Sequence, residues 1–177
     1  MTDTLLTEYR DGVTTFTINR PHVRNAVDAP TMIALREGIE ACETNGTRVI
    51  VITGANGSFS SGTDISVALQ PGVTPDTAYE ILTAAYGPTL LAIRSSSWPV
   101  IAAVDGMAAG LGCDLALACD LRLVADDVQF RMAEPTLGLV PDLGGTYPLV
   151  HAVGHQRAVE ICLTGRPVGA EEAVRIG

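Results

Sequence analysis

The chain has 177 residues, 47% of them hydrophobic, and a formal net charge of −9 at pH 7. This length and this share of apolar residues are sufficient to bury the core of one globular domain. Eleven basic residues stand against twenty acidic ones, and no Lys/Arg cluster interrupts this excess of negative charge. Nucleic acid and anionic membrane surfaces are therefore not expected as partners, because their phosphates would be repelled.

The first residues show no basic region followed by an apolar stretch, so no secretory signal is apparent and a cytoplasmic location is expected. The most apolar stretch, residues 100–119, contains Asp105 and Asp114, which would be costly in hydrocarbon. It is therefore interpreted as buried strand, loop and helix. The four cysteines lack the spacing of metal ligands, and we expect reduced thiols in the core: Cys42, Cys113, Cys119 and Cys162.

The first half of the chain opens with a predicted β-hairpin. Residues 5–9 and 13–18 are strand-like and flank Asp11-Gly12, a strong hairpin signal. A helix is expected to begin after Asp28, which can cap it, and to end at Asn45-Gly46; its apolar residues recur at spacings of three and four. Residues 49–52 form a continuous β-branched run, which suits a strand buried on both faces of a sheet.

The second half alternates between expected helices and strands. After a loop at residues 71–75, the predicted elements in chain order are a helical segment at 77–95 divided or kinked by Pro88, a buried strand at 99–104, a helix at 115–118, a strand at 121–125, a short edge strand at 129–131, a helix from Gly144-Gly145, and a helix at 155–163 ending at Gly165. This alternation predicts an α/β layer without an internal linker.

Two glycine-flanked stretches, residues 59–65 and 106–114, are candidates for parts of a catalytic site. Each follows an apolar strand-like run and ends in an acid that begins a helical pattern. Such loops can aim two backbone N–H groups at one point, where preorganised donors at a helix N-terminus stabilise a developing oxyanion. The two stretches together favour an enzyme.

With these two stretches, residues 133–146, Asn19-Arg20-Pro21 and Asn25-Ala26-Val27, the chain resembles the crotonase superfamily, also called the enoyl-CoA hydratase/isomerase family. The resemblance implies an α/β fold built as a spiral of repeated ββα units, with residues 1–177 as a single core domain that lacks the C-terminal helical segment of the family. It also implies an acyl-CoA thioester substrate, with coenzyme A as part of that substrate, and neither a metal nor a redox cofactor. Relatives usually form trimers, so a homo-oligomer, a trimer or a dimer of trimers, is expected if the C-terminal segment is present.

Carried over residue by residue, the resemblance makes the backbone N–H groups of Thr63 and Leu111 the oxyanion donors. The residues it places along the substrate are Arg24, Ala26, Ser61, Asp64, Ile65 and Gly110. Arg24 corresponds to a position near the CoA phosphates, whereas Ser61 and Ile65 lie where the family lines the adenine and pantetheine path.

Three acids are the candidate proton-transfer groups: Asp114, Glu134 and Asp142. Asp114 and Glu134 match the two glutamates that hold a water in hydratases of the family. Asp114 is one methylene shorter than glutamate, and a misplacement of about 1 Å can cost about 10²-fold in rate. The trio resembles the dienoyl-CoA isomerase pattern, so double-bond isomerisation is favoured; hydration of a 2-enoyl-CoA by Asp114 and Glu134 is the alternative. Each acid alone could also be a helix-capping or solvent-facing residue.

Two alternative functions of other classes have weaker support in the sequence. The stretch from Gly110 to Gly112 superficially resembles a dinucleotide fingerprint, but Leu115 occupies its third glycine position, and only eight residues separate Gly112 from Leu121, fewer than a parallel crossover needs. Because relatives continue past residue 177, a truncated, non-catalytic acyl-CoA-binding or assembly protein is the second alternative.

Overall fold

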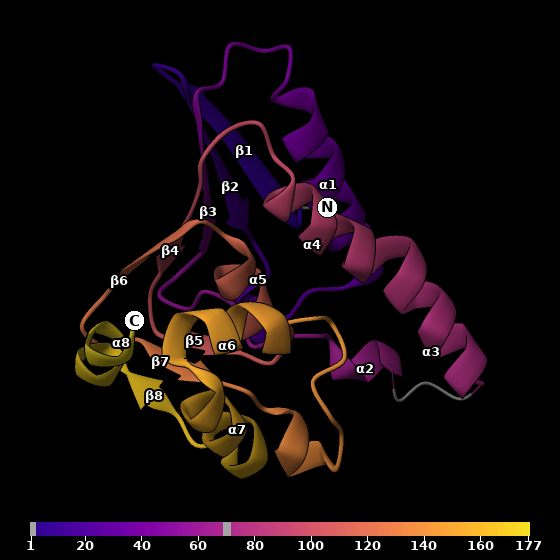
Figure 1. The fold of residues 1–177 in the computed structure, drawn as a ribbon. Coiled ribbons are helices and arrows are strands. Elements are labelled where there is room, and N and C mark those ends of the chain that lie inside the picture. The colour runs from indigo at the N-terminus through magenta and orange to yellow at the C-terminus, as the bar shows by residue number, and fades with distance from the viewer. Residues whose placement is uncertain (1–2, 69–71) are drawn as a thin grey trace.

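The computed structural model describes residues 3–68 and 72–177, and it contains two sheets (Figure 1). The larger has the strand order β1-β2-β3-β4-β6, in which only the β1–β2 pair is antiparallel. Its strands are β1 (Leu5–Arg10), β2 (Val13–Ile18), β3 (Val49–Gly54), β4 (Val100–Val104) and β6 (Leu121–Val124). The smaller sheet has the order β5-β7-β8, with β5 (Met107–Ala109), β7 (Gln129–Arg131) and β8 (Val168–Gly169).

The predicted hairpin and the start of its neighbouring helix are confirmed, whereas the helix ends at Ala41 rather than at Asn45-Gly46. Asp11 and Gly12 both have positive φ, 54° and 86°, as a two-residue turn between twisted strands requires. Helix α1 (Ala29–Ala41) begins after Asp28, whose Oδ1 accepts a hydrogen bond from the Thr31 N–H at 3.0 Å.

In the described part of the chain seven further helices follow: α2 (Ile65–Ala68), α3 (Pro75–Ile81), α4 (Gly87–Arg94), α5 (Leu111–Ala118), α6 (Thr146–Val153), α7 (His155–Thr164) and α8 (Ala170–Ile176). Two 3₁₀ turns add Pro21–Val23 and Glu134–Leu137. Gly165 ends α7 in the left-handed conformation, as expected. The loop expected at residues 71–75 lies partly outside the described residues, and α3 begins at its last residue. Of the helices in the described ranges, none is both long and apolar enough to cross a membrane.

The helical segment at 77–95 is divided by a π-helical turn rather than by Pro88 itself. The turn covers Leu82–Tyr86, and the Gly87 N–H donates to the Leu82 carbonyl. Pro88 lies in the first turn of α4 and has no backbone N–H to donate, so the series of helical hydrogen bonds is interrupted there. A π-helical turn contains one residue more than an α-helical turn. This irregularity lies one turn before Pro88, where the sequence predicts that the helix is divided.

Three sequence expectations about the strands are wrong. Strands β3 and β4 are buried on one face only, because α1, α4 and α5 cover one face of the large sheet; Ile50 and Ile52 are fully buried, whereas Val49 and Val51 are half-buried. Strand β7 is the middle strand of its sheet, paired with β5 and β8, not an edge strand.

The third wrong expectation concerns the connection after the second glycine stretch. Strands β4 and β6 pair in parallel, and the chain between them runs through β5 and α5, which is a crossover helix. The count of eight residues from Gly112 is misleading because the glycine stretch itself forms the first turn of α5. Two turns of the chain, β4-β5-α5 and β6-β7-α6, each add one strand to each sheet and then a helix, as the expected ββα spiral requires.

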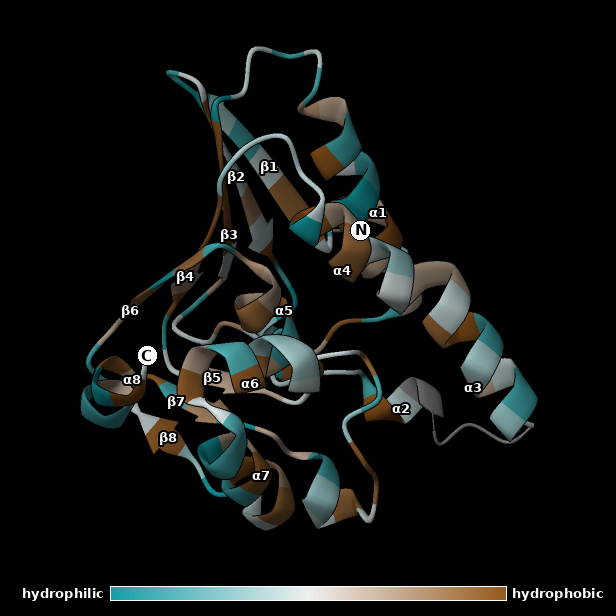
Figure 2. Cartoon of the chain, viewed as in Figure 1, coloured by the Kyte–Doolittle hydropathy of each residue, from teal (hydrophilic) through white to brown (hydrophobic). Residues whose placement is uncertain are grey.

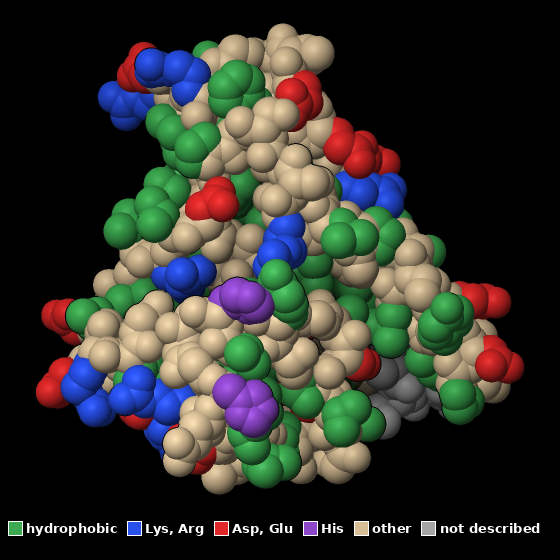
Figure 3. Space-filling model, in the orientation of Figure 1, with side chains coloured by type: hydrophobic (Ala, Val, Ile, Leu, Met, Phe, Trp, Pro, Cys, Tyr) green, Lys and Arg blue, Asp and Glu red, His purple; other side chains and the backbone are tan. Residues whose placement is uncertain are grey.

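The core forms two clusters of buried side chains. The larger lies between the five-stranded sheet and the helices α1, α4 and α5; the smaller joins α5 to α6, α7 and α8. Figure 2 shows apolar residues along the central strands and mixed apolar and polar faces on α1 and α7. On the face drawn in Figure 3, basic and acidic side chains are interspersed. Helix α5 is buried along its whole length, because it belongs to both clusters.

Candidate active site

The two glycine stretches lie side by side in the structure. The Ser60 N–H donates to the Met107 carbonyl at 3.0 Å, and the Ala109 N–H donates back to the Ser60 carbonyl at 3.0 Å. A Cβ atom placed on Gly62, whose φ is +100°, would lie 2.7 Å from the Ala109 oxygen and 3.4 Å from the Leu111 nitrogen. Only glycine permits this close approach, so the residue before Thr63 packs directly against the start of α5.

The orientation of the Thr63 amide follows from its pairing with a third segment. Val27 forms a parallel bridge with Thr63, in which the Val27 N–H donates to the Gly62 carbonyl and the Asp64 N–H donates to the Val27 carbonyl, both at 2.8 Å. Because residues 62 and 64 make these bonds, the N–H of Thr63 is directed away from Val27.

The Leu111 amide is the first of α5 and follows Gly110, whose φ is +52°. The first N–H groups of a helix have no partner within the helix. Within residues 3–68 and 72–177, neither the Thr63 N–H nor the Leu111 N–H donates a hydrogen bond. Both predicted donors are therefore free to bind a carbonyl oxygen, beside a helix N-terminus that favours negative charge.

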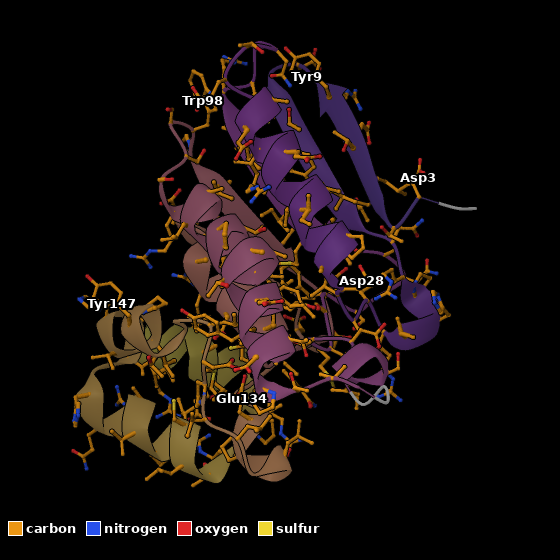
Figure 4. All side chains as sticks on the ribbon, turned by 90° about the vertical axis from the view of Figure 1, so that its right-hand side faces the viewer. Asp3, Tyr9, Asp28, Trp98, Glu134 and Tyr147 are labelled. Carbon is orange, nitrogen blue, oxygen red and sulfur yellow. The ribbon has the colours of Figure 1, made fainter. Side chains whose placement is uncertain are left out.

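Glu134 opens the 3₁₀ turn after β7, and Figure 4 shows it where the C-terminal elements meet the preceding helices. Its Oε1 lies 3.3 Å from the position that a Cβ on Gly110 would occupy, so the carboxyl group is next to the residue that precedes the Leu111 amide. Its Oε2 is buried and has no hydrogen-bond partner in the described part of the chain. Burial raises the pKa of Glu134, and the charge of Asp142 raises it further.

Asp114 projects from α5 and is only 2% exposed. Both carboxyl oxygens lack a hydrogen-bond partner among the described residues. Burial raises the pKa of Asp114 to about 8, with smaller contributions from Glu134 and Asp142. Its carboxyl group packs against Gly145, where any Cβ atom would collide with it. Burial therefore favours the protonated form of Asp114, which can donate a proton.

Asp142 is exposed in the segment before α6, and its charge acts on both other acids. The structure thus brings the three predicted acids together from three elements. Raised pKa values at two neighbouring acids, Asp114 and Glu134, both caused mainly by burial, are a pattern found at functional sites.

Of the residues predicted along the substrate, Ser61, Asp64 and Ile65 belong to the first glycine stretch and Gly110 to the second. Arg24 is exposed and its backbone has the left-handed conformation. Ala26 is buried, and Ile65 is 54% exposed. The Ser61 hydroxyl donates to the Val23 carbonyl at 3.1 Å. Gly110 is buried beside Glu134. Whether these residues contact the substrate remains a prediction.

Asp64 is mainly engaged within the protein. Its Oδ1 accepts from the Ser66 N–H and hydroxyl, and its Oδ2 pairs with Arg20 at 2.9 Å. The hydrogen bond from Ser66 holds the pKa of Asp64 below its usual value, and Arg20 adds to this effect against the opposing effect of burial. The Asn19-Arg20-Pro21 motif predicts no role for Arg20, because no local pattern indicates its contact with Asp64.

An apolar cavity of about 340 Å³ lies among the C-terminal elements, apart from the three acids. Its walls include Cys113, Leu117, Phe130, Met132 and Ile176. Burial raises the pKa of Cys113, which makes it an inert thiol. None of the three acids lines this cavity, so its size does not make it the reaction site.

The elevated pKa of Asp114 predicts how stability changes with pH. The folded protein retains this proton up to about pH 8, whereas the unfolded chain loses it near pH 4, so the native state binds more protons between these values. Stability should therefore fall as the pH rises through this window, by at most about 1.4 kcal/mol per pH unit from this group. In Asp114→Asn, urea unfolding from pH 4 to 8 should show a flatter profile than the wild type. An unchanged slope would contradict the assigned environment of Asp114.

A spiral of ββα units with strands in two sheets is the fold expected of a crotonase-like protein. The family model described as enoyl-CoA hydratase/isomerase matches residues 8–177. The chain is 38% identical over 174 residues to a "Probable enoyl-CoA hydratase" of Rhodobacter capsulatus and covers 98% of itself and 66% of that protein. It is 40% identical over 181 residues to a "Probable enoyl-CoA hydratase" of Mycobacterium bovis, with coverage of 95% and 61%.

Among solved structures, a protein of Thermobifida fusca YX in complex with CoA superposes with a TM-score of 0.88 at 41% identity, covering 98% of this chain and 69% of that one. The chain belongs to the enoyl-CoA hydratase/isomerase family. The family match covers Gly110 to Gly112, so the resemblance of this stretch to a dinucleotide fingerprint receives no support from it. The chain spans 61% to 66% of the length of the two curated relatives.

Proposed function

We propose that the protein acts on an enoyl-CoA thioester and shifts its double bond by moving a proton. The observation that supports this most is the pair of N–H groups at Thr63 and Leu111, which lack a hydrogen-bond partner among the described residues, with the Glu134 carboxyl group next to Gly110. A thioester carbonyl bound by both donors has a more acidic α-proton, because they stabilise the enolate oxygen; one such donor is worth about 3 kcal/mol. The CoA in the Thermobifida fusca complex agrees with this class of substrate.

In the proposed reaction, Glu134 acts as the base because it lies next to Gly110 and so next to the bound carbonyl. It removes a proton from C2 of a 3-enoyl-CoA, and the electrons of that C–H bond form the dienolate, whose oxygen is bound by the two amides. A carboxylic acid then delivers a proton to C4, which restores the carbonyl and leaves a 2-enoyl-CoA. Asp142 and Asp114 are the groups near enough to Glu134 to assist this transfer.

Hydration of a 2-enoyl-CoA is the second candidate, favoured by the names of both curated relatives. It needs two carboxyl groups that hold a water, and the unpartnered oxygens of Asp114 and Glu134 could do so. Isomerisation is preferred because Asp114 is short for this task and because a third acid, Asp142, acts on both groups.

Product analysis separates these candidates. The protein is incubated separately with a 2-enoyl-, a 3-enoyl- and a 3,5-dienoyl-CoA, and products are measured by mass spectrometry in ordinary and heavy water. Isomerisation leaves the mass unchanged in ordinary water, whereas hydration adds one water. We expect isomerisation that is lost in Asp142→Ala. Hydration that depends on Asp114 and Glu134 alone would overturn this preference. Binding of each thioester without any product would instead favour a non-catalytic acyl-CoA-binding protein.

A further inference from the structure

Arg20 joins three segments of the chain around Thr63. Its side chain is only 12% exposed. Nη1 donates to the Ala26 carbonyl at 2.6 Å, while Nη2 lies 2.9 Å from Asp64 Oδ2 and 3.2 Å from Asp28 Oδ2. The guanidinium fork thus spans the segment before α1 and the segment before α2, and its planar donors suit two carboxylates at once.

Each of the two aspartates that Arg20 joins uses its second oxygen to cap a helix. Asp28 Oδ1 accepts from the Thr31 N–H at the start of α1, and Asp64 Oδ1 accepts from the Ser66 N–H at the start of α2. Figure 4 shows Asp28 at the beginning of its helix. One cation therefore holds two helix caps together and keeps their negative charges from repelling each other.

Thr63 lies between these contacts. The two bonds of Val27, to the Gly62 carbonyl and from the Asp64 N–H, hold the backbone on both sides of Thr63. A further bond joins the Arg20 N–H to the side chain of Asn25, which is fully buried and has a φ of +56°. Loss of the guanidinium would leave two close, poorly solvated carboxylates, and their repulsion would act directly on the Val27–Thr63 bridge.

We infer that Arg20 is a positioning residue that aims the Thr63 N–H at the substrate carbonyl by joining the caps of α1 and α2. The catalytic part of this inference rests on the proposed function, whereas the structural part, control of the Val27–Thr63 bridge, does not. A shift of about 1 Å at an oxyanion donor is sufficient to lower the rate about 10²-fold.

The test uses Arg20→Met, which keeps an unbranched apolar side chain without the charged guanidinium group, and Arg20→Lys, which retains the charge without the fork. Arg36→Met is the matched control, because Arg36 forms a single ion pair at 3.7 Å with Glu40 on the surface of α1. Hydrogen exchange of the Val27 and Asp64 amides, followed by NMR without substrate, should be at least about 10-fold faster in Arg20→Met and unchanged in Arg36→Met.

In the presence of an enoyl-CoA that the wild type turns over, kcat of Arg20→Met should fall about 10²-fold while KM stays within about threefold. Arg20→Lys should be intermediate in both measurements, and decides the question if Arg20→Met does not fold. Wild-type exchange at Val27 and Asp64 in folded Arg20 variants would overturn the inference. Because exchange needs no substrate, an inactive wild type would refute the proposed function and leave this test intact.

Discussion

Glu134→Gln is expected to lower kcat by about 10² to 10⁴ fold, because glutamine retains the shape of the side chain but cannot accept a proton. The carboxyl group lies beside Gly110 with its Oε2 unpartnered, so the substitution removes the base without removing an internal hydrogen bond of that oxygen. Substrate binding should change little, because the two amides and the CoA contacts remain.

The measurement is kcat and KM for the enoyl-CoA that the wild type converts, with Glu43→Gln as the control at an exposed glutamate. Since burial raises the pKa of Glu134, the wild-type rate should increase with pH. The midpoint of this increase should lie at a higher pH than the pKa of an ordinary glutamate. Activity of Glu134→Gln within a few fold of the wild type would exclude Glu134 as the base.

Gly62→Ala is expected to lower kcat by about 10² to 10³ fold, the effect of losing one oxyanion donor. The new methyl group would lie 2.7 Å from the Ala109 oxygen, and a φ of +100° is strained for alanine. Both effects push residues 62 and 63 away from the start of α5, so the predicted convergence of the two N–H groups would be lost.

Gly154→Ala is the matched control for this substitution. Gly154 also has a positive φ, +80°, but no described atom lies within 4 Å of the added methyl group, and the residue belongs to the turn between α6 and α7. Steady-state kinetics of both variants should show a large loss for Gly62→Ala alone. Equal losses would mean that backbone strain in general, and not the donor pair, controls the rate.

The sequence predicted those parts of the fold whose cause is local. Asp11-Gly12 sets its hairpin and Asp28 caps its helix through atoms no more than a few residues apart. Distant strands and helices decide whether β7 lies at the edge or in the middle of its sheet, and whether β3 is covered on one face or on both. No local pattern encodes these contacts. The crossover through α5 was missed because a glycine stretch served both as a loop and as the first turn of a helix.

The candidate site likewise combines residues that local motifs predict with contacts that depend on distant residues. The three acids and two donor residues were named from motifs, and the structure groups the acids around α5. The role of Arg20 was not predictable, because it depends on contacts with Asp64, 44 positions away. Gly145 was likewise expected only to begin a helix, whereas its lack of a side chain makes room for the Asp114 carboxyl group.

The most direct test of the account is the carbonyl stretching frequency of a bound acyl-CoA, measured by infrared spectroscopy with ¹³C at the thioester carbonyl. Two N–H donors should polarise the C=O bond, so the band of the bound thioester should lie at a lower frequency than in water, and Gly62→Ala should reverse most of this shift. A thioester that binds with the same frequency as in water would show that the Thr63 and Leu111 amides do not converge on its oxygen.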